Sequence, residues 1–465
     1  MKLSKLMLAV AVLAVGSAAV AAPLNTRIGY STGASATKSN LKTTLSAMCV
    51  TGGGVLTEFT SGSNVSTYVC GLAALTTGSA GTYATSANTT FKNFAGTNFA
   101  ELRLNTAAGS FSAVRGLNGV FTDDYGVALN FRDPILAADR TQAQLVVDRA
   151  GVVFVGGLMD VEPSAFPAAV LAGFTVPKTP SIGIQQAFGV AVSIPLYNAM
   201  FASQQTTGST TSALPIPSTC LVTDTAKAEC VPTISKGQMA AVLSASDTNA
   251  AYGNGANFLA STLISGTELR YVRRPNTSGT QSAAQNYFLG LPCAAVASAV
   301  VPEPVGNDEI DTVVVAGFSP TTVDLVDNMV NSIRVLLAPG TGNVRQELSK
   351  SVIADGTPNY AIGVMSGENN QTSGNSFRWV RVQGAAMSEN AAPNNGQLNR
   401  AAVINGSYDF YFESVYVPGT GAGAATAFWG PVSTSLKTLN STGLVRAADQ
   451  LYTKGGASCA ASSAN

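Results

Sequence analysis

The feature that most constrains the fold is a repeated alternation between short apolar strand patterns and stretches with helical periodicity. Strands that alternate with helices along a chain favour an α/β fold with a parallel or mixed sheet. A further apolar run, Leu145–Leu158, predicts a strand region that ends at Asp160. The predicted strand and helix pairs are Thr26–Tyr30 with Ala36–Met48, Phe99–Leu104 with a helical stretch through Leu117, Thr267–Arg274 with a helix carrying Ala283, Ala284, Tyr287 and Phe288, and Asp311–Phe318 with a helix carrying Val323, Val326, Val330, Ile333 and Leu337.

The length of the chain predicts more than one lobe. The 465 residues exceed the usual size of a single domain, and about two lobes are expected. Stretches rich in small polar residues interrupt the regular pattern, so we expect loops inserted into a regular core. These stretches are Ser203–Ser218, Gly367–Ser376 and Pro418–Thr426.

Residues 1–21 have the three parts of a secretory signal. Lys2 and Lys5 supply the positive start, Leu6–Val15 the apolar run, and Ala19–Ala21 a small-residue cleavage box. A membrane anchor is the alternative, but the apolar run is shorter than the roughly 20 residues that span a bilayer. We therefore expect this segment to be removed and the chain to be exported, either periplasmic or secreted.

Composition excludes several classes of function. The chain carries 26 basic and 26 acidic residues, so it lacks the positive excess that is typical of a nucleic-acid-binding protein. It contains no histidine, which rules out a Ser-His-Asp triad, a Cys-His dyad and a histidine-ligated metal. Ser35 and Lys38 have Ser-x-x-Lys spacing, but the Lys-Thr-Gly motif that accompanies it in acyl-transfer enzymes is missing. We therefore expect neither an enzyme activity nor a cofactor.

Two acidic stretches are candidates for a divalent cation. Asp123–Asp124 and Asn307–Glu309 supply carboxylates but lack the glycine-bearing spacing of a calcium loop. We predict solvated turns at both places and no metal site.

The six cysteines favour disulfides in an oxidising compartment, and none has Cys-x-x-Cys spacing. Cys49–Cys70 is the first predicted pair, because both lie early in the chain with no closer partner. Cys220–Cys230 with Cys293–Cys459 is the simplest arrangement of the others, and a Cys230–Cys293 pair is the alternative.

Three turns between a predicted strand and a predicted helix are rich in glycine, serine and threonine: Thr32–Thr37, Gly109–Ser112 and Asn276–Thr280. The first N–H groups of a helix lack intrahelical partners and the helix dipole is positive at that end, so such turns suit anions. Arg274, just before the third turn, would add a bidentate positive charge. Helix capping alone is the alternative at each turn. None of them has the Gly-Lys-Ser or Gly-Lys-Thr of a nucleotide phosphate loop.

The segment around the third turn resembles a known anion-binding loop. Arg273–Thr280 is similar to the Arg-x-Asp-x-Ser-Gly-Thr loop of periplasmic phosphate-binding proteins, which are the type 2 substrate-binding proteins of phosphate importers. Further segments resemble landmarks of that family in the same order: Gly33–Thr37, Gly109–Ser110, Gly156–Asp160, Phe188–Tyr197 and Ala361–Val364.

The resemblance implies a two-lobed clamp with two hinge crossings and long loop insertions. Residues 22–199 and 406–465 would form lobe 1 and residues 200–405 lobe 2, with phosphate or a related oxyanion in the cleft between them. The resemblance also implies a monomer whose partner is the permease of an ABC importer. Asp160 would accept a hydrogen bond from a protonated oxygen of the anion, and Arg274 would pair with its charge. The residues carried over as ligand-binding are Thr37, Ser110, Asp160, Arg274, Asn276, Ser278, Gly279 and Thr280.

The chain departs from the family pattern at three positions. The family's loop aspartate is Asn276 here, its phenylalanine after the first threonine is Lys38, and its glycine before Ser-Gly-Thr is Thr277. Asp160 would then be the acidic acceptor that favours a protonated oxygen and repels sulfate, unless it only caps the next helix. Lys38 either is solvated or points into the cleft. The alternative function is a secreted surface or interaction protein that kept the clamp fold without binding a small anion.

Overall fold

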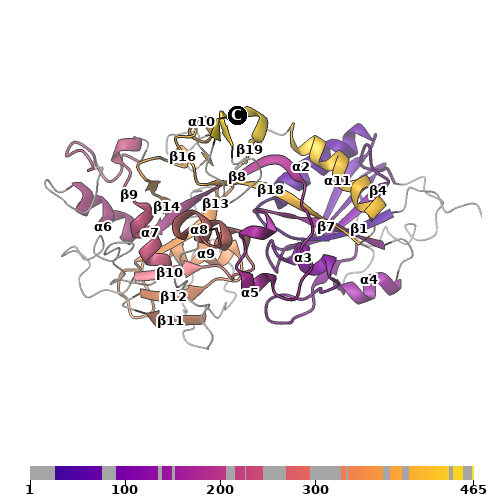
Figure 1. The fold of residues 1–465 in the computed structure, drawn as a ribbon, viewed down its shortest axis with the longest axis horizontal. Helices are drawn as coiled ribbons and strands as arrows, with labels where there is room; N and C mark the ends of the chain where they lie inside the picture. The colour runs from indigo at the N-terminus through magenta and orange to yellow at the C-terminus, as the bar shows by residue number, and fades with distance from the viewer. Residues whose placement is uncertain are drawn as a thin grey trace, which may run out of the picture.

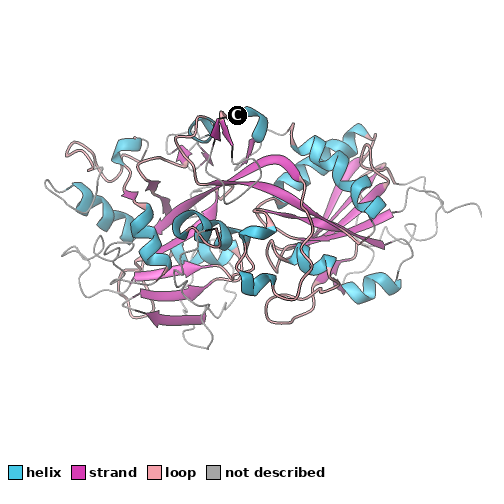
Figure 2. Cartoon of the chain, viewed as in Figure 1, coloured by secondary structure: helices cyan, strands magenta, loops and turns pink. Residues whose placement is uncertain are grey.

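The computed structural model has a mixed α/β fold in which helices pack on both sides of a long sheet (Figure 2). This sheet contains 13 strands within the described residues. The described residues are 27–75, 91–134, 139–148, 152–205, 215–225, 227–244, 269–293, 326–330, 333–369, 377–389, 397–398, 400–420, 422–438, 444–453 and 463–464.

Three parallel strands form the centre of the first half of the sheet. β1 (Arg27–Thr32) lies between β4 (Phe99–Asn105) and β7 (Val152–Met159), and all three run in the same direction. Their carboxyl ends therefore lie along one edge of the sheet. Antiparallel strands extend this triplet on both sides, namely β3 (Val65–Gly71) and β2 (Val55–Ser61) beyond β4, and β18 (Tyr411–Pro418) beyond β7.

A second parallel triplet forms the centre of the other half. β10 (Leu269–Arg273) lies between β12 (Ile333–Leu337) and β13 (Ala361–Ser366). β11 (Val326–Val330) follows on the outer side and is antiparallel to β12. The carboxyl ends of β12, β10 and β13 thus also lie together.

One long strand, β8 (Ser181–Ser193), joins the two halves (Figure 1). Its first residues pair with β18 and its last residues with β13, and the partner changes between Ala187 and Phe188. β14 (Phe377–Trp379) and β19 (Leu444–Arg446) also pair with β8. The strand order along the sheet is β11-β12-β10-β13-β8-β18-β7-β1-β4-β3-β2.

Helices cover both faces of the first half. α2 (Lys38–Thr51) and α11 (Ala422–Leu436) share a buried core with Val155 of β7. The neighbouring Phe154 points to the opposite face, where α3 (Ser112–Leu117) approaches so closely that a Cβ on Gly116 would lie 2.5 Å from the phenylalanine ring.

Helices also cover both faces of the second half, and β10 shows which helix lies on which face. Arg270 forms an ion pair with Glu347 of α9 (Thr341–Ser349), with 2.7 Å between Nη1 and Oε1. The next residue, Tyr271, points the other way and places its hydroxyl 3.3 Å from Oε1 of Gln281 in α8 (Gly279–Leu289). α8 and α9 therefore lie on opposite faces. α7 (Lys236–Leu243) packs on α8, and α6 (Ile194–Gln205) packs on β8.

Short elements complete the described chain. The short helices are α4 (Gln142–Asp148), α5 (Ala168–Leu171), α10 (Arg400–Ile404), η3 (Pro163–Ala165), η4 (Ala228–Cys230) and η6 (Ala447–Asp449). The short strands pair as β5 (Asn130–Arg132) with β6 (Asp139–Thr141), β9 (Thr233–Ile234) with β15 (Arg381–Val382), β16 (Ser388–Glu389) with β17 (Gln397–Leu398), and β20 (Tyr452–Thr453) with β21 (Ser463–Ala464).

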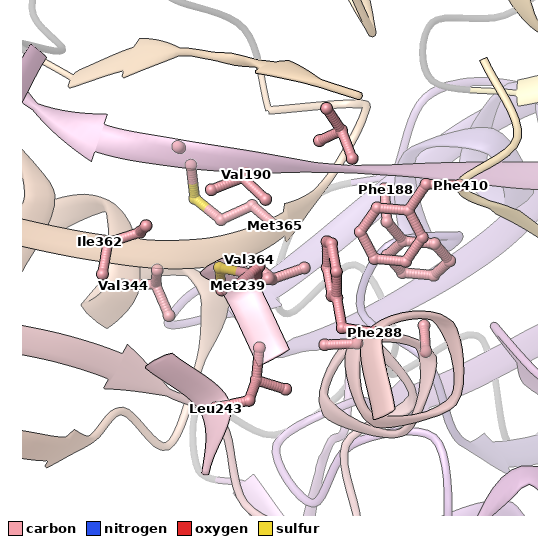
Figure 3. Close-up of a cluster of buried hydrophobic side chains, with 14 of the residues drawn as sticks. Phe188, Val190, Met239, Leu243, Phe288, Val344, Ile362, Val364, Met365 and Phe410 are labelled. Carbon is pink, nitrogen blue, oxygen red and sulfur yellow. The ribbon is translucent and has the colours of Figure 1, made fainter. Parts of the chain in front are cut away.

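An aromatic cluster lies where β8 changes partners (Figure 3). The ring of Phe410, just before β18, lies 5.7 Å from that of Phe188 in β8 and 5.1 Å from that of Phe288 in α8. The amide of Phe188 also donates to the carbonyl oxygen of Phe410 at 3.0 Å. Burying a side chain of this size stabilises a fold by about 1.5–3 kcal/mol, so the cluster holds elements of both halves together at their junction.

The predicted strands near residues 27, 99 and 269 and the helices that follow them are confirmed. The strand predicted over Leu145–Leu158 is wrong in its first part, because residues 142–148 form α4 and the strand begins at Val152. Pro418–Thr426 is likewise not entirely a loop, since α11 begins at Ala422. The predicted strand Asp311–Phe318 lies outside the described residues.

The helix predicted with Val326, Val330, Ile333 and Leu337 is wrong, because these residues belong to the antiparallel strands β11 and β12. Their spacing fits a helix, but Ile333, Val335 and Leu337 also alternate with the period of a strand. β12 pairs on both edges, with β10 and β11, and its apolar residues are buried. Tertiary pairing decided between two periodicities that the same residues satisfy.

Two predicted disulfides are confirmed. Cys49–Cys70 and Cys220–Cys230 have Cα–Cα distances of 5.5 and 5.4 Å. The second pair excludes the alternative bond between Cys230 and Cys293. Cys293 is itself disulfide-bonded, while Cys459 and the predicted signal segment lie outside the described residues.

Candidate functional site

The carboxyl ends of the first strand triplet carry three of the predicted ligand-binding residues. Thr37 ends the loop after β1, Ser110 lies in the loop after β4, and Asp160 directly follows β7. The loop after β1 is held against β7, because the amide of Ala34 donates to the carbonyl oxygen of Leu158 at 2.8 Å. Thr37 is bonded within this loop, where its Oγ1 donates to the carbonyl oxygen of Ala34 at 3.3 Å.

Ser110 and Asp160 are in direct contact. The hydroxyl of Ser110 donates to Oδ2 of Asp160 at 2.9 Å, and both side chains are buried. Burial raises the pKa of Asp160 to about 6, although the hydrogen bond from Ser110 and the charge of Arg274 act in the opposite direction. The carboxylate is therefore costly to ionise in this environment, while it remains a strong hydrogen-bond acceptor.

Arg274 holds the equivalent position in the second triplet, directly after β10. Its Nη1 donates to Oγ1 of Thr341 at 2.8 Å, and its Nη2 donates to the carbonyl oxygen of Pro339 at 3.0 Å. Both partners lie at the N-terminus of α9, so the guanidinium has a fixed orientation. Burial lowers the pKa of Arg274 to about 10, against the opposing effect of the charge of Asp160. The side chain thus stays charged at neutral pH.

The N-terminus of α8 packs directly against the Ser110–Asp160 pair. A Cβ on Gly279 would lie 2.4 Å from Oγ of Ser110 and 2.9 Å from Oδ2 of Asp160, so this approach requires glycine. Gly109, which has a φ of +68°, faces Ser278 in the same contact, with 3.3 Å between its ideal Cβ and the Ser278 Cα. The loops after β4 and β10 therefore bring the carboxyl ends of the two triplets face to face.

Further bonds join the same two loops. The amide of Phe111 donates to the carbonyl oxygen of Thr277 at 3.0 Å. The hydroxyl of Thr277 donates to Oδ2 of Asp124, whose Oδ1 forms an ion pair with Arg115 at 2.8 Å. Thr277 thus contacts a segment that follows α3, on the side of the first strand triplet.

Asn276 is directed to its neighbours in the second half. Its Oδ1 accepts from Nη2 of Arg273 at 2.5 Å and from Nε2 of Gln285 in α8 at 3.3 Å. Arg273 and Arg274 follow the alternation of the strand, and the first turns toward α8 while the second turns toward α9.

The structure thus assembles most of the predicted set. Ser110 and Asp160 lie against Gly279, with Ser278 and the buried Thr280 in the adjoining turn of α8. Arg274 acts on Asp160 through its charge. The hydrogen bond of Thr37 goes to Ala34, and Asn276 bonds to Arg273 and Gln285.

Glu368, which sequence reasoning missed, lies two residues after β13 at the same set of strand ends. Its Oε1 accepts from the Ser366 hydroxyl at 2.6 Å, and its Oε2 accepts from Nε2 of Gln186 at 3.3 Å. Burial raises the pKa of Glu368 to about 7, and the charge of Asp160 acts in the same direction. The sequence feature that indicates Glu368 is an acid just beyond a buried strand, at the start of the polar stretch Gly367–Ser376.

Two polar atoms in this site have no hydrogen-bond partner among the described residues. They are Oδ1 of Asp160 and Nε of Arg274, on side chains that are 3% and 4% exposed. Leaving a buried donor or acceptor unsatisfied costs roughly 1–3 kcal/mol. A ligand that both donates and accepts a hydrogen bond would satisfy both atoms.

Helix capping does not account for these residues. The N-cap of η3, which follows Asp160, is Glu162. Thr37 and Ser278 occupy the N-cap positions of α2 and α8, but neither makes a side-chain capping bond within the described structure. The capping alternative is therefore not supported at Thr37, Asp160 or Ser278.

The remaining charged candidates make hydrogen bonds to backbone groups of turns. Nζ of Lys38 donates to the carbonyl oxygen of Ser63 at 2.7 Å, in the turn between β2 and β3. Oδ1 of Asp123 accepts from the amides of Tyr125 and Val127, as expected for a turn. The described residues contain no group of three or more acids or cysteines placed to hold a metal ion, and Asn307–Glu309 lies outside them.

Comparison with known proteins gives a distant likeness in structure. No family model matches the chain, and no curated protein matches its sequence. The structure is similar to that of a protein from Clostridium perfringens, described as a phosphate ABC transporter substrate-binding protein with bound phosphate. The match covers 87% of this chain and 93% of the other, with 11% identity and a TM-score of 0.38. At this TM-score the likeness assigns no ligand to this chain.

In the described part of the chain, every helix is too short or too polar to cross a bilayer.

Proposed function

We propose that this chain is an exported solute-binding protein that holds phosphate, or a related oxyanion carrying a proton, between the carboxyl ends of the two strand triplets. The observation that carries the proposal is the pair of buried, unsatisfied atoms, Oδ1 of Asp160 and Nε of Arg274. One is an acceptor and the other a donor, and the two side chains interact electrostatically. A protonated oxyanion has a matching donor and acceptor, and the protein performs no chemistry on it.

The proposed ligand fits the rest of the site. Its O–H donates to Asp160, and another of its oxygens accepts from Arg274. The N-terminus of α8 adds backbone N–H donors and the positive end of a helix dipole. A fully ionised anion such as sulfate offers Asp160 no proton and adds repulsion, so it binds more weakly.

A hinged clamp explains how such a ligand reaches a site that is closed by direct loop contacts. The change of partner along β8 at Ala187 and Phe188 supports a division into two bodies near this point. Residues 22–199 with 406–465 form one lobe of the proposed clamp and residues 200–405 the other. Separation of the loops that carry Ser110 and Gly279 would admit the anion. Export and delivery to an ABC importer permease are part of the proposal.

Calorimetric titration of the ligand-free mature chain with phosphate, and then with sulfate, tests the proposal. We expect saturable phosphate binding and weaker sulfate binding. Phosphate at about 100 times its Kd should also stabilise the fold by about 2.7 kcal/mol. A secreted interaction protein without an anion site would show neither heat nor stabilisation, and that result would refute the proposal.

A pair of matched variants locates the site. Arg274→Lys keeps the charge but removes Nε and the planar fork, so phosphate affinity should fall about tenfold or more. Arg270→Lys is the control, because Arg270 lies in the strand that precedes Arg274, is equally buried and pairs with Glu347 instead. It should lower the unfolding free energy while it leaves phosphate affinity unchanged. Equal affinities of the two variants would place the anion elsewhere.

A further inference from the structure

Glu368 places a second acid beside the proposed anion site. Glu368 lies two residues after β13, and β13 pairs with β10, which Arg274 directly follows. Its charge acts on Asp160 after β7, on Arg274 and on Arg345 of α9. The set therefore contains two acids and two bases, and its charge is balanced when all four side chains are ionised. A doubly charged anion adds two negative charges to this set, and both arginines of the set are already balanced by the two acids.

The hydrogen bonds of Glu368 come from neutral groups. Oε1 accepts from the hydroxyl of Ser366 at 2.6 Å and from Nδ2 of Asn369 at 3.3 Å. Oε2 accepts from the amide of Gln186 in β8. A hydroxyl accepts as well as donates, so the same geometry also suits the protonated acid. Nothing in this bonding requires Glu368 to keep its negative charge.

We propose that Glu368 belongs to the same site and takes up a proton from solvent when a doubly charged anion binds beside Arg274. This inference rests on the proposed function. The proton neutralises Glu368, removes its repulsion of the anion and leaves Arg274 and Arg345 as the counter-charges. Anion binding is thereby coupled to pH.

The order of protonation follows from the surroundings. Burial raises the pKa of Glu368 to about 7, above the value of about 6 for Asp160. Glu368 is therefore the acid that gains a proton first as negative charge enters the site. The positive charges of Arg274 and Arg345 oppose the protonation of Glu368, and Gln186 on the adjoining strand carries no charge. Binding should weaken as pH rises through 7, because the proton then has to be taken from a more alkaline solution.

The test compares wild type with Glu368→Gln by phosphate titration at about pH 5.5 and about pH 8.5, on either side of the range in which the acid titrates. Phosphate itself titrates in this range, but the ratio of variant to wild-type affinity cancels that effect. We expect a ratio near one at the lower pH, where Glu368 is neutral. At the higher pH we expect the variant to bind more tightly, by about tenfold or more, because wild type then has to take up a proton from a solution whose pH lies above the pKa of Glu368.

Controls separate the two proposals. Glu413→Gln removes the same charge from β18, where Glu413 accepts from Ser181, and it should give a ratio near one at both pH values. Glu368→Met, a neutral side chain of similar length, serves if the amide variant does not fold. If wild type binds phosphate but the ratio of Glu368→Gln affinity to wild-type affinity does not change with pH, this inference is overturned and the proposed function stands. Absence of phosphate binding by wild type overturns both.

Discussion

Asp160→Asn should make the ligand-free protein more stable and a poorer binder of phosphate. The substitution keeps the shape of the side chain and an oxygen that can accept from Ser110, but it removes a carboxylate that is buried beside the N-terminus of α8. Substitution of a residue that serves only the fold would lower the free energy of unfolding of the protein. A residue that is unfavourable for the fold and useful for binding should show the opposite result.

The size of the gain follows from the pKa. Asp160 titrates near 3.8 in the unfolded chain and near 6 in the folded protein, because burial disfavours its charge. Between these values the folded protein keeps a proton that the unfolded chain has released, so the free energy of unfolding falls as pH rises from about 4 to about 6. The difference between these two pKa values corresponds to about 3 kcal/mol. The amide cannot ionise, so the variant should be about 2–3 kcal/mol more stable than wild type at pH 8 and equally stable at pH 4.

Urea unfolding of ligand-free protein at these two pH values measures the difference, and calorimetry measures phosphate affinity, which should fall about tenfold or more once the charged acceptor is lost. Asp133→Asn is the matched control. Asp133 is also buried in the first half, but it faces Arg103 with 3.4 Å between Oδ2 and Nη1. Its substitution should destabilise the fold by about 1–3 kcal/mol. An Asp160→Asn protein that is no more stable than wild type at pH 8 would refute the assigned environment of Asp160.

Three further predictions test contacts of the fold. Gly279→Ala places a methyl group against Ser110 and Asp160, so the free energy of phosphate binding in calorimetry should weaken by about 1–3 kcal/mol. In the control Gly342→Ala, in the first turn of α9, the new methyl group meets no atom within 4 Å, and phosphate affinity should be unchanged. The double substitution of Cys49 and Cys70 by serine opens a loop with a sequence separation of 21 and should lower the urea unfolding free energy by about 3 kcal/mol. Glu347→Gln leaves the buried Arg270 and Lys350 without their common carboxylate and should cost about 3–5 kcal/mol in the same assay, and a loss under about 1 kcal/mol would contradict the described network.

Part of the candidate site was predictable because its residues lie at strand ends that the sequence marks clearly. Ser110 and Gly279 follow strands whose patterns are unambiguous, and a parallel arrangement brings such ends to one edge. The partner of each arginine was not predictable. Alternation along β10 shows that Arg273 and Arg274 point apart, but only the positions of α8 and α9 decide which of them meets Thr341 and which meets Asn276.

Glu368 and the β11–β12 pair were missed for a common reason. The apolar residues from Val326 to Leu337 satisfy both a helical and a strand period, and only the pairing of β12 with β10 selects the strand. In the same way, an acid in a polar loop has no pattern of its own. The neighbours of Glu368 are decided by the pairing of β13 with β10 and by the position of Asp160 after β7.

The sequence by itself indicated the alternation of strands and helices, the small-residue turns at the helix starts and the pairing of Cys49 with Cys70, because each depends on residues that are near one another in the chain. It left two partners open for Cys230, and the structure selected Cys220. The tertiary structure alone decided that β1 lies between β4 and β7, that the two triplets meet through Ser110 and Gly279, and that Glu368 joins them. Strand order and side-chain burial arise from packing between distant segments. The ionisation of Asp160 and Glu368 depends on that burial, which no local spacing records.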